Sequence, residues 1–255
     1  MEWKPWRPWC PKQIDLYKDR KFYYKNLPSL KDLSIYSVNA RSLPNKKVSL
    51  QAILEKESIY IGFVSEINTK NPDKFPGYNS FKLISKKKFH GMLAVVHGSI
   101  ANNVIRIPHN IEEFEIIHLQ FQQALIPLNI IGVYLDVEGR TSVDDVKRVH
   151  SKLQSIIQFH LDKQEQVICL GDCNRNPFVT NPSAGTKLLL DWLKEGEMIM
   201  LNDNTPTRID PATKVGTTLD LCLVSKTLSE NVDKFLVDIN EEITPVNKHK
   251  KTNRS

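Results

Sequence analysis

The sequence predicts an α/β fold in which two mixed β-sheets pack face to face and helices cover their outer faces. Residues 78–135 contain a run of strand-like segments without helical patterns between them, which argues against a doubly wound parallel sheet. Several of these segments are continuously apolar, as strands covered on both faces are. At 255 residues and 40% hydrophobic content, the chain can bury one substantial core.

The expected elements alternate along the chain. Strands are predicted at 33–40, 60–64, 78–84, 91–97, 102–107, 114–121, 127–135, 166–170, 218–224 and 235–239, and helices at 43–60, 142–160 and 186–195. The helix at 142–160 has the clearest pattern, because its apolar residues recur at three- and four-residue steps and Asp144 and Asp145 suit its first turn. Pro44 favours the start of the helix at 43–60, and Pro76-Gly77 predicts a turn between strands.

Basic residues are concentrated at the two ends of the chain. Of the net charge of +6, residues 1–31 carry +5 and residues 246–255 carry +4, so the part between them is mildly acidic. The Trp- and Pro-rich residues 3–9 cannot form the interior of a helix, because proline lacks the backbone N–H and has a fixed φ. We therefore divide the chain into a basic leader (1–30), one domain (31–245) and a basic tail (246–255). The ends suit contact with phosphate, although solvated tails without a partner are the alternative.

The sequence also excludes several classes of protein. No apolar run reaches the roughly 20 residues that cross a membrane. The four cysteines (Cys10, Cys169, Cys173 and Cys222) fit no zinc spacing, and scattered free thiols indicate a reducing, intracellular compartment. Six histidines lie in no metal-ligand spacing, so we expect surface or satisfied-core roles for His90, His97, His109, His118, His150 and His160.

The most informative motif is Gly171-Asp172-Cys173-Asn174, which ends the apolar strand at 166–170. Asp172 and Asn174 are two residues apart and so point to one side of an extended chain. A carboxylate beside an amide suits hydrolysis of a phosphate ester, in which water is activated and anionic oxygens are held. An Asx turn before Pro177 is the alternative interpretation.

Polar residues end four further strands: Asn39, Glu66, Tyr134 and Asp220. Each has a structural alternative. Asn39 can cap the helix that follows, Glu66 can be a surface charge in a loop, and Tyr134 can pack at the rim of the sheet. Asp220 lies in a core strand and needs a partner if it is buried, which favours a functional role.

With these residues in place, the chain resembles the endonuclease/exonuclease/phosphatase superfamily and, within it, the apurinic-endonuclease-like domain of LINE-type (non-LTR) retrotransposons. The resemblance covers roughly residues 33–245. The motifs that carry it are Ser37-Val38-Asn39-Ala40-Arg41-Ser42-Leu43, Ser65-Glu66, Gly132-Val133-Tyr134, Leu170-Gly171-Asp172-Cys173-Asn174, Asn204-Thr205-Pro206-Thr207-Arg208 and Thr217-Thr218-Leu219-Asp220. Each motif is weak alone, but their order is specific.

The resemblance implies a four-layer α/β sandwich and a Mg²⁺-dependent phosphodiesterase, with Mn²⁺ as the alternative cation. Glu66 would bind the metal with Asn39 close by, Asp172 would deprotonate the attacking water, and Asn174 and Tyr134 would hydrogen-bond the scissile phosphate. Asp220 completes the catalytic set. Three arginines in or beside the motifs, Arg41, Arg175 and Arg208, are assigned to nucleic-acid binding.

The implied partner is DNA, nicked to prime reverse transcription, with a reverse transcriptase region in the same polyprotein. We expect a nuclear monomer with no membrane association. Two alternatives remain: a catalytically dead relic that binds DNA, and another phosphoesterase of the superfamily.

Two departures from the family pattern bear on activity. The family continues to a Ser-Asp-His motif, whereas this sequence ends at Ser255, where that motif would begin. A truncated chain, a piece of a longer polyprotein and a degenerate copy each explain this. Loss of one donor to the transition state costs roughly 10²–10³ in rate, so we expect the chain to fold but to cut DNA poorly. In addition, His90-Gly91-Met92 stands where the family has a glycine pair.

Overall fold

The computed structural model describes residues 13–14, 33–70, 74–85, 90–121, 126–137, 142–210 and 212–237. The predicted basic tail and nearly all of the predicted leader lie outside these residues, so the proposed roles of both segments stay predictions. Of the described helices, none has the length and apolar character that a membrane span requires.

The first sheet has five strands in the order β1-β2-β3-β5-β4. Their bounds are Gln13–Ile14 (β1), Leu33–Asn39 (β2), Ile61–Ser65 (β3), Tyr78–Leu83 (β4) and Met92–His97 (β5). β2 and β3 run parallel and the other pairs are antiparallel. Helix α1 (Lys47–Lys56) makes the parallel connection and packs its apolar face on this sheet, where Leu54 reaches Gly62 of β3.

The second sheet has six strands in the order β10-β13-β9-β8-β7-β6. Their bounds are Val104–Ile107 (β6), Glu115–Phe121 (β7), Leu128–Tyr134 (β8), Gln166–Asp172 (β9), Met198–Met200 (β10) and Asp220–Ser225 (β13). Only β8 and β9 run parallel, and α3 (Val143–Leu161) connects them. Helix α4 (Ala184–Lys194) packs beside α3.

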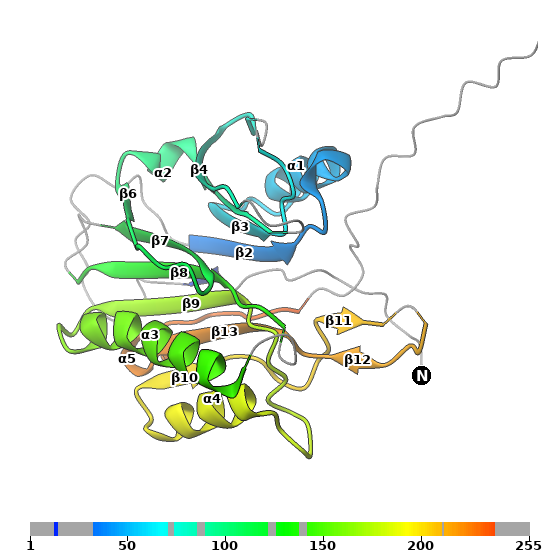
Figure 1. Cartoon of the computed structure of the whole chain (residues 1–255). Helices are drawn as coiled ribbons and strands as arrows, with labels where there is room; N and C mark the ends of the chain where they lie inside the picture. The colour runs from blue at the N-terminus through cyan, green and yellow to red at the C-terminus, as the bar shows by residue number, and fades with distance from the viewer. Residues whose placement is uncertain are drawn as a thin grey trace, which may run out of the picture.

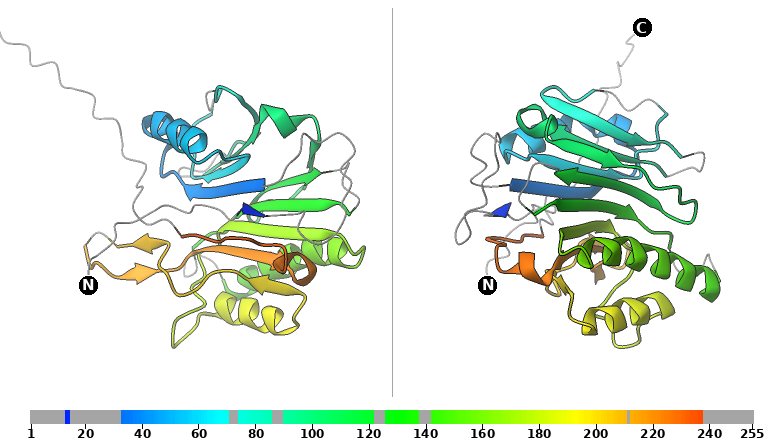
Figure 2. Two further views of the ribbon diagram at one scale, coloured as in Figure 1. Left: turned by 180° about the vertical axis from the view of Figure 1, so that it is seen from behind. Right: turned by 90° about the vertical axis from the view of Figure 1, so that its left-hand side faces the viewer.

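Alternate residues of the second sheet belong to two different cores. Ile168 and Leu170 of β9 lie in the core shared with the first sheet, whereas Val167 and Cys169 pack with residues of α3 and α4. Figures 1 and 2 show the resulting layers: α1, two sheets, and then α3 with α4. The predicted four-layer sandwich of two mixed sheets with helices outside is confirmed.

The two sheets approach each other closely at one glycine. A β-carbon on Gly132 of β8 would lie 2.1 Å from the ring of Phe63 in β3. Within the second sheet, a β-carbon on Gly171 would lie 2.1 Å from the carbonyl oxygen of Val133, and Gly171 has a φ of +139°. Both positions therefore require glycine, and both lie near the ends of the strands that carry Tyr134 and Asp172.

Most predicted elements are present, with two corrections. The helix predicted at 43–60 is shorter, because a 3₁₀ turn (Leu43–Asn45, η1) precedes α1 and α1 ends at Lys56. The strand predicted at 235–239 is wrong for residues 235–237, which have no regular structure. Phe235 nevertheless packs against the core, which explains the apolar pattern there.

Several short elements were not predicted. They are β1, which lies in the leader, α2 (Gly98–Ala101), β10, the hairpin of β11 (Arg208–Ile209) and β12 (Gly216–Thr217), and α5 (Lys226–Ser229). The β11–β12 hairpin projects from the end of the molecule at which β2 finishes (Figure 1).

Candidate functional site

The polar strand-end residues meet at one edge of the sandwich. Asn39, Tyr134 and Asp172 are the last residues of β2, β8 and β9, and Glu66 directly follows β3. Asp220 begins β13, which runs antiparallel to β9, so that Asp220 lies opposite Asp172. Tyr134 is the register partner of Asp172 on its other side. The topology therefore collects five side chains from both sheets.

Hydrogen bonds join these side chains. The Asn39 amide nitrogen Nδ2 donates to Glu66 Oε1 at 2.7 Å and to Asp172 Oδ2 at 2.9 Å. The Tyr134 hydroxyl donates to the same Glu66 oxygen at 3.2 Å. The predicted site residues Asn39, Glu66, Tyr134 and Asp172 are thus one connected group.

The structural alternatives for three of these residues can now be assessed. Asn39 caps no helix, because its side-chain oxygen accepts from Arg41 N and the residue before η1 is Ser42. Glu66 is partly buried and hydrogen-bonded, so it is not a free surface charge. Asp172 does accept from Asn174 N at 3.1 Å, as in an Asx turn, while its other oxygen faces Asn39.

Backbone contacts between loops hold the site in place. Ala40 N donates to Ser65 O and Ser42 N donates to Glu66 O, so that the loops after β2 and β3 are tied together. Arg41, Glu66 and Asn174 all have φ between 45° and 50°, a conformation that non-glycine residues rarely adopt. Strained backbone of this kind is typical of functional sites.

Thr207 is a site residue that sequence reasoning did not single out. Its hydroxyl oxygen accepts from Leu219 N at 2.9 Å and from Asp220 N at 3.0 Å. The hydroxyl proton is then free to be donated to the Asp220 carboxylate, and this hydrogen bond lowers the Asp220 pKa. The Pro206-Thr207-Arg208 motif carried the signal, but only Arg208 was taken from it.

The electrostatics of the site are those of crowded acids. Burial and the charge of Asp220 raise the pKa of Asp172 to about 8, although hydrogen bonds from Asn39 and Asn174 oppose the shift. Burial raises the pKa of Asp220 to about 6, against the opposing effect of Thr207, Arg41 and Arg208. Burial, followed by the charges of Glu66 and Asp172, also raises the Tyr134 pKa. The site therefore favours a bound positive charge.

The donor set fits a hard divalent cation. Within the described parts of the chain, no three His, Cys, Asp or Glu side chains are arranged to hold a metal ion by themselves. Mg²⁺ needs less than that, because it is bound through one or two carboxylates and keeps several waters. Glu66 offers a carboxylate oxygen beside Asp172, whereas Asn39, the second predicted metal contact, turns its amide nitrogen to both carboxylates and its oxygen to Arg41 N. A cation there would oppose the burial and the repulsion that raise the Asp172 pKa.

The remaining predicted site residues have different surroundings. Asn174 lies beside Asp172, but its side-chain amide donates to Leu135 O at 2.7 Å. Arg41 and Arg208 are exposed and lower the pKa of Asp220. Arg175 is only 6% exposed, and its guanidinium donates to the carbonyl oxygens of Asp136 and Asn174. The nucleic-acid contact predicted for Arg175 is therefore corrected to a structural role in this loop.

A second polar cluster lies at the opposite end of the second sheet. There His118 Nε2 donates to Asn129 Oδ1 at 3.0 Å, and His118 Nδ1 lies 2.9 Å from His109 Nε2. Asn129 Nδ2 in turn donates to Glu165 Oε2 at 2.9 Å. Glu165 also contacts His160 at 2.6 Å. These histidines have the satisfied-core roles that the sequence predicted.

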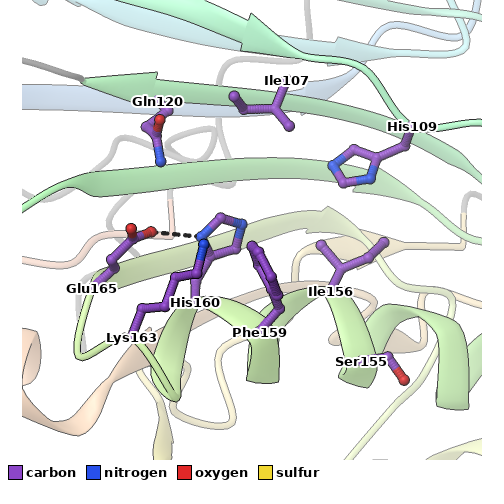
Figure 3. A pocket seen from close by; sticks show the side chains of 9 residues that line it. All are labelled: Ile107, His109, Gln120, Ser155, Ile156, Phe159, His160, Lys163 and Glu165. Atoms are coloured by element: carbon purple, nitrogen blue, oxygen red, sulfur yellow. Dashed lines mark hydrogen bonds and ion pairs between the residues drawn. The ribbon is translucent and has the colours of Figure 1, made fainter.

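This cluster borders a pocket of about 530 Å³ that the candidate site does not share. Figure 3 shows the pocket between the sheet edge and α3, with Phe159 and His160 rising from the helix and His109 facing them.

Comparison with known proteins places the fold. No protein-family model matches the sequence, and no curated protein matches it. Among solved structures, the endonuclease domain of TRAS1, a telomere-specific non-LTR retrotransposon, aligns with a TM-score of 0.55 and 16% identity over 76% of this chain and 85% of that chain. The catalytic domain of Xenopus laevis APE2 aligns with a TM-score of 0.61 and 16% identity over 77% and 83%.

An AP endonuclease from Archaeoglobus fulgidus aligns with a TM-score of 0.56 and 15% identity over 78% of this chain and 88% of that chain. At such identities the likeness establishes the fold. The chain thus has the α/β sandwich of AP-endonuclease-like proteins, as its motifs predicted.

Proposed function

We propose that this chain is a Mg²⁺-dependent DNA endonuclease that nicks a phosphodiester bond, and that it belongs to a LINE-type retrotransposon polyprotein. The observation that carries the proposal is the hydrogen-bonded group of Asn39, Glu66, Tyr134 and Asp172, with Asp220 opposite Asp172. These residues were predicted from separate motifs, and Asn39 and Asp172 are 133 residues apart in the chain. In the fold they lie together, as hydrolysis of a phosphate diester requires.

Asp172 is the proposed general base. Its carboxylate is buried, and a pKa of about 8 gives it the proton affinity that a base near neutral pH needs. Asn39 orients one oxygen and the Asn174 backbone orients the other, which aims the carboxylate at a water in the site. Mg²⁺ held by Glu66 beside Asp172 would supply positive charge against the phosphate oxygens and the leaving oxygen.

Tyr134 and Asp220 complete the proposed chemistry. The raised pKa keeps the Tyr134 hydroxyl protonated, so that it can donate to a phosphate oxygen beside Glu66. Asp220, held by Thr207, lies opposite Asp172. Arg41 and Arg208 are exposed near this acidic group, where their guanidinium groups can bind the DNA backbone.

Supercoiled plasmid incubated with the chain and Mg²⁺ tests the proposal, with conversion to the open-circular form as readout. We expect nicking that Asp172→Ala abolishes, and no effect of Asp144→Ala, a control acid exposed on α3. DNA binding without nicking would instead favour the relic.

A further inference from the structure

His90 lies beside the candidate site in a way that the sequence did not predict. Its ring packs edge-on against Tyr134, with ring centroids 5.3 Å apart and an interplanar angle of 85°. On the Tyr134 side chain, the hydroxyl reaches Glu66 Oε1 at 3.2 Å. The imidazole therefore contacts the ring whose hydroxyl belongs to the site, while it remains outside the hydrogen-bonded group itself.

Two carboxylates hold the imidazole from opposite sides. His90 Nδ1 lies 3.2 Å from Glu115 Oε1, and Nε2 lies 3.5 Å from Asp136 Oδ1. A carboxylate oxygen accepts hydrogen bonds, and a ring nitrogen donates only when it carries a proton. Both ring nitrogens of His90 therefore face a carboxylate oxygen, and side-chain exposures of 16% for His90 and 12% for Glu115 shield the His90–Glu115 pair from solvent.

These carboxylates are themselves fixed relative to Tyr134. Glu115 is the register partner of Tyr134 across β7 and β8, and both of its oxygens accept from Gly91 N, at 2.9 and 2.8 Å. Asp136 follows Tyr134 by two residues. Both carboxylates that contact His90 are therefore held in a fixed position relative to Tyr134.

The backbone of His90 is tied to the other side of the site. Its carbonyl oxygen accepts from Asn68 N, and the carbonyl oxygen of Gly91 accepts from Ile67 N. These donors belong to the loop that carries Glu66. Through its backbone and its side chain, His90 thus links the segment of Glu66 with the segment of Tyr134.

We propose that His90 is a positioning residue for Tyr134: clamped between Glu115 and Asp136, it fixes the tyrosine ring so that the hydroxyl is aimed at Glu66 and at the phosphate. This inference rests on the proposed endonuclease function. It gives His90 a role that requires no direct contact between the imidazole and the DNA.

A double-mutant cycle on the full chain tests the inference. We expect His90→Ala to lower kcat for nicking about tenfold with less than a twofold change in KM. In a Tyr134→Phe background, which keeps the ring and removes the hydroxyl, the same change should lower kcat less than twofold. His90→Gln, which can still donate to one carboxylate, should recover part of the loss. Equal losses in both backgrounds would overturn the proposal.

His97→Ala is the matched control. His97 is the last residue of β5, at the end of that strand far from His90, and packs edge-on against the tyrosines Tyr60 and Tyr78. It should leave kcat per folded molecule unchanged, whereas a comparable loss in this variant would mean that His90 acts through stability alone.

A second readout does not depend on activity. With ¹³Cζ-labelled tyrosine, the Tyr134 resonance, assigned by its absence in Tyr134→Phe, should shift in His90→Ala and stay in place in His97→Ala. If the wild-type chain never nicks DNA but this shift occurs, the proposed function fails and the positioning role stands. An unshifted Tyr134 resonance in His90→Ala would overturn the positioning role whatever the activity.

Discussion

Asn39 and Asp172 are joined by a hydrogen bond of 2.9 Å between the two sheets, although 133 residues separate them in the chain. The same amide nitrogen also donates to Glu66, so one small side chain orients two carboxylates that would otherwise repel each other. The Asn39 side chain therefore both joins the two sheets and orients the carboxylates of the candidate site.

Asn39→Ala should impair both stability and activity. Removal of the donor leaves Asp172 with fewer partners in a buried setting, which costs about 1–3 kcal/mol of unfolding free energy. Nicking should fall roughly 100-fold, since Asp172 and Glu66 lose their common orientation. Urea unfolding and plasmid nicking measure the two effects. Asn231→Ala, which removes only a local contact to Thr227, should change neither much, and an active Asn39→Ala would contradict the assigned role.

Stability should fall as the pH rises from about 4 to about 8. The Asp172 pKa is about 8 in the folded chain and about 3.9 in an unfolded one, so within this window the folded state holds a proton that the unfolded state has released. The contribution is fully present below about pH 4 and is lost as the pH passes through 8. Chemical unfolding across this range, without metal, should show a flatter slope for Asp172→Asn and an unaltered slope for Asp144→Asn.

Mg²⁺ should stabilise the folded chain. A cation that binds only the folded state adds about 2.7 kcal/mol of unfolding free energy at 100 times its dissociation constant. Thermal unfolding with and without Mg²⁺ should reveal a rise in Tm that Glu66→Gln removes. The effect should grow between pH 5 and 8, where Asp172 otherwise retains its proton. A pH-independent rise that survives Glu66→Gln would place the ion elsewhere.

Gly132→Ala should destabilise the sandwich without touching the site chemistry directly. The added methyl group would lie 2.1 Å from the Phe63 ring, so the two sheets must shift or the ring must leave its place, at a cost of about 1–3 kcal/mol. In a Phe63→Ala background the same methyl should cost little. Additive losses in unfolding experiments would show that the close approach is not the cause.

The sequence predicted the site best where a polar residue follows directly on an apolar strand, because the strand fixes where that residue lies. Asn39, Tyr134 and Asp172 each end an apolar strand. Parallel pairing sets Asn39 beside Ser65 and Tyr134 beside Asp172, and the packing of the two sheets then joins Asn39 to Asp172. Arg175 and Asn174 show what the motif alone does not reveal, because both side chains donate to backbone carbonyl oxygens rather than point into the site.

Other features depended on contacts that no local pattern encodes. Thr207 and His90 act through partners distant in the chain, so their roles required the tertiary arrangement. Residues 235–237 have a strand-like composition but serve as an irregular apolar cover for the core. The short strands β11 and β12 contain two residues each, too few for any periodicity.

The antiparallel pairing of β9 with β13 sets Asp172 opposite Asp220, so the site depends on the register of these two strands. Side chains alternate across a sheet, so a slip of one residue would turn the Asp220 carboxylate towards the helices and bring Leu221 to the edge. A slipped chain would therefore lack the two facing carboxylates, and Asp172 would lose the neighbouring charge that helps to raise its pKa.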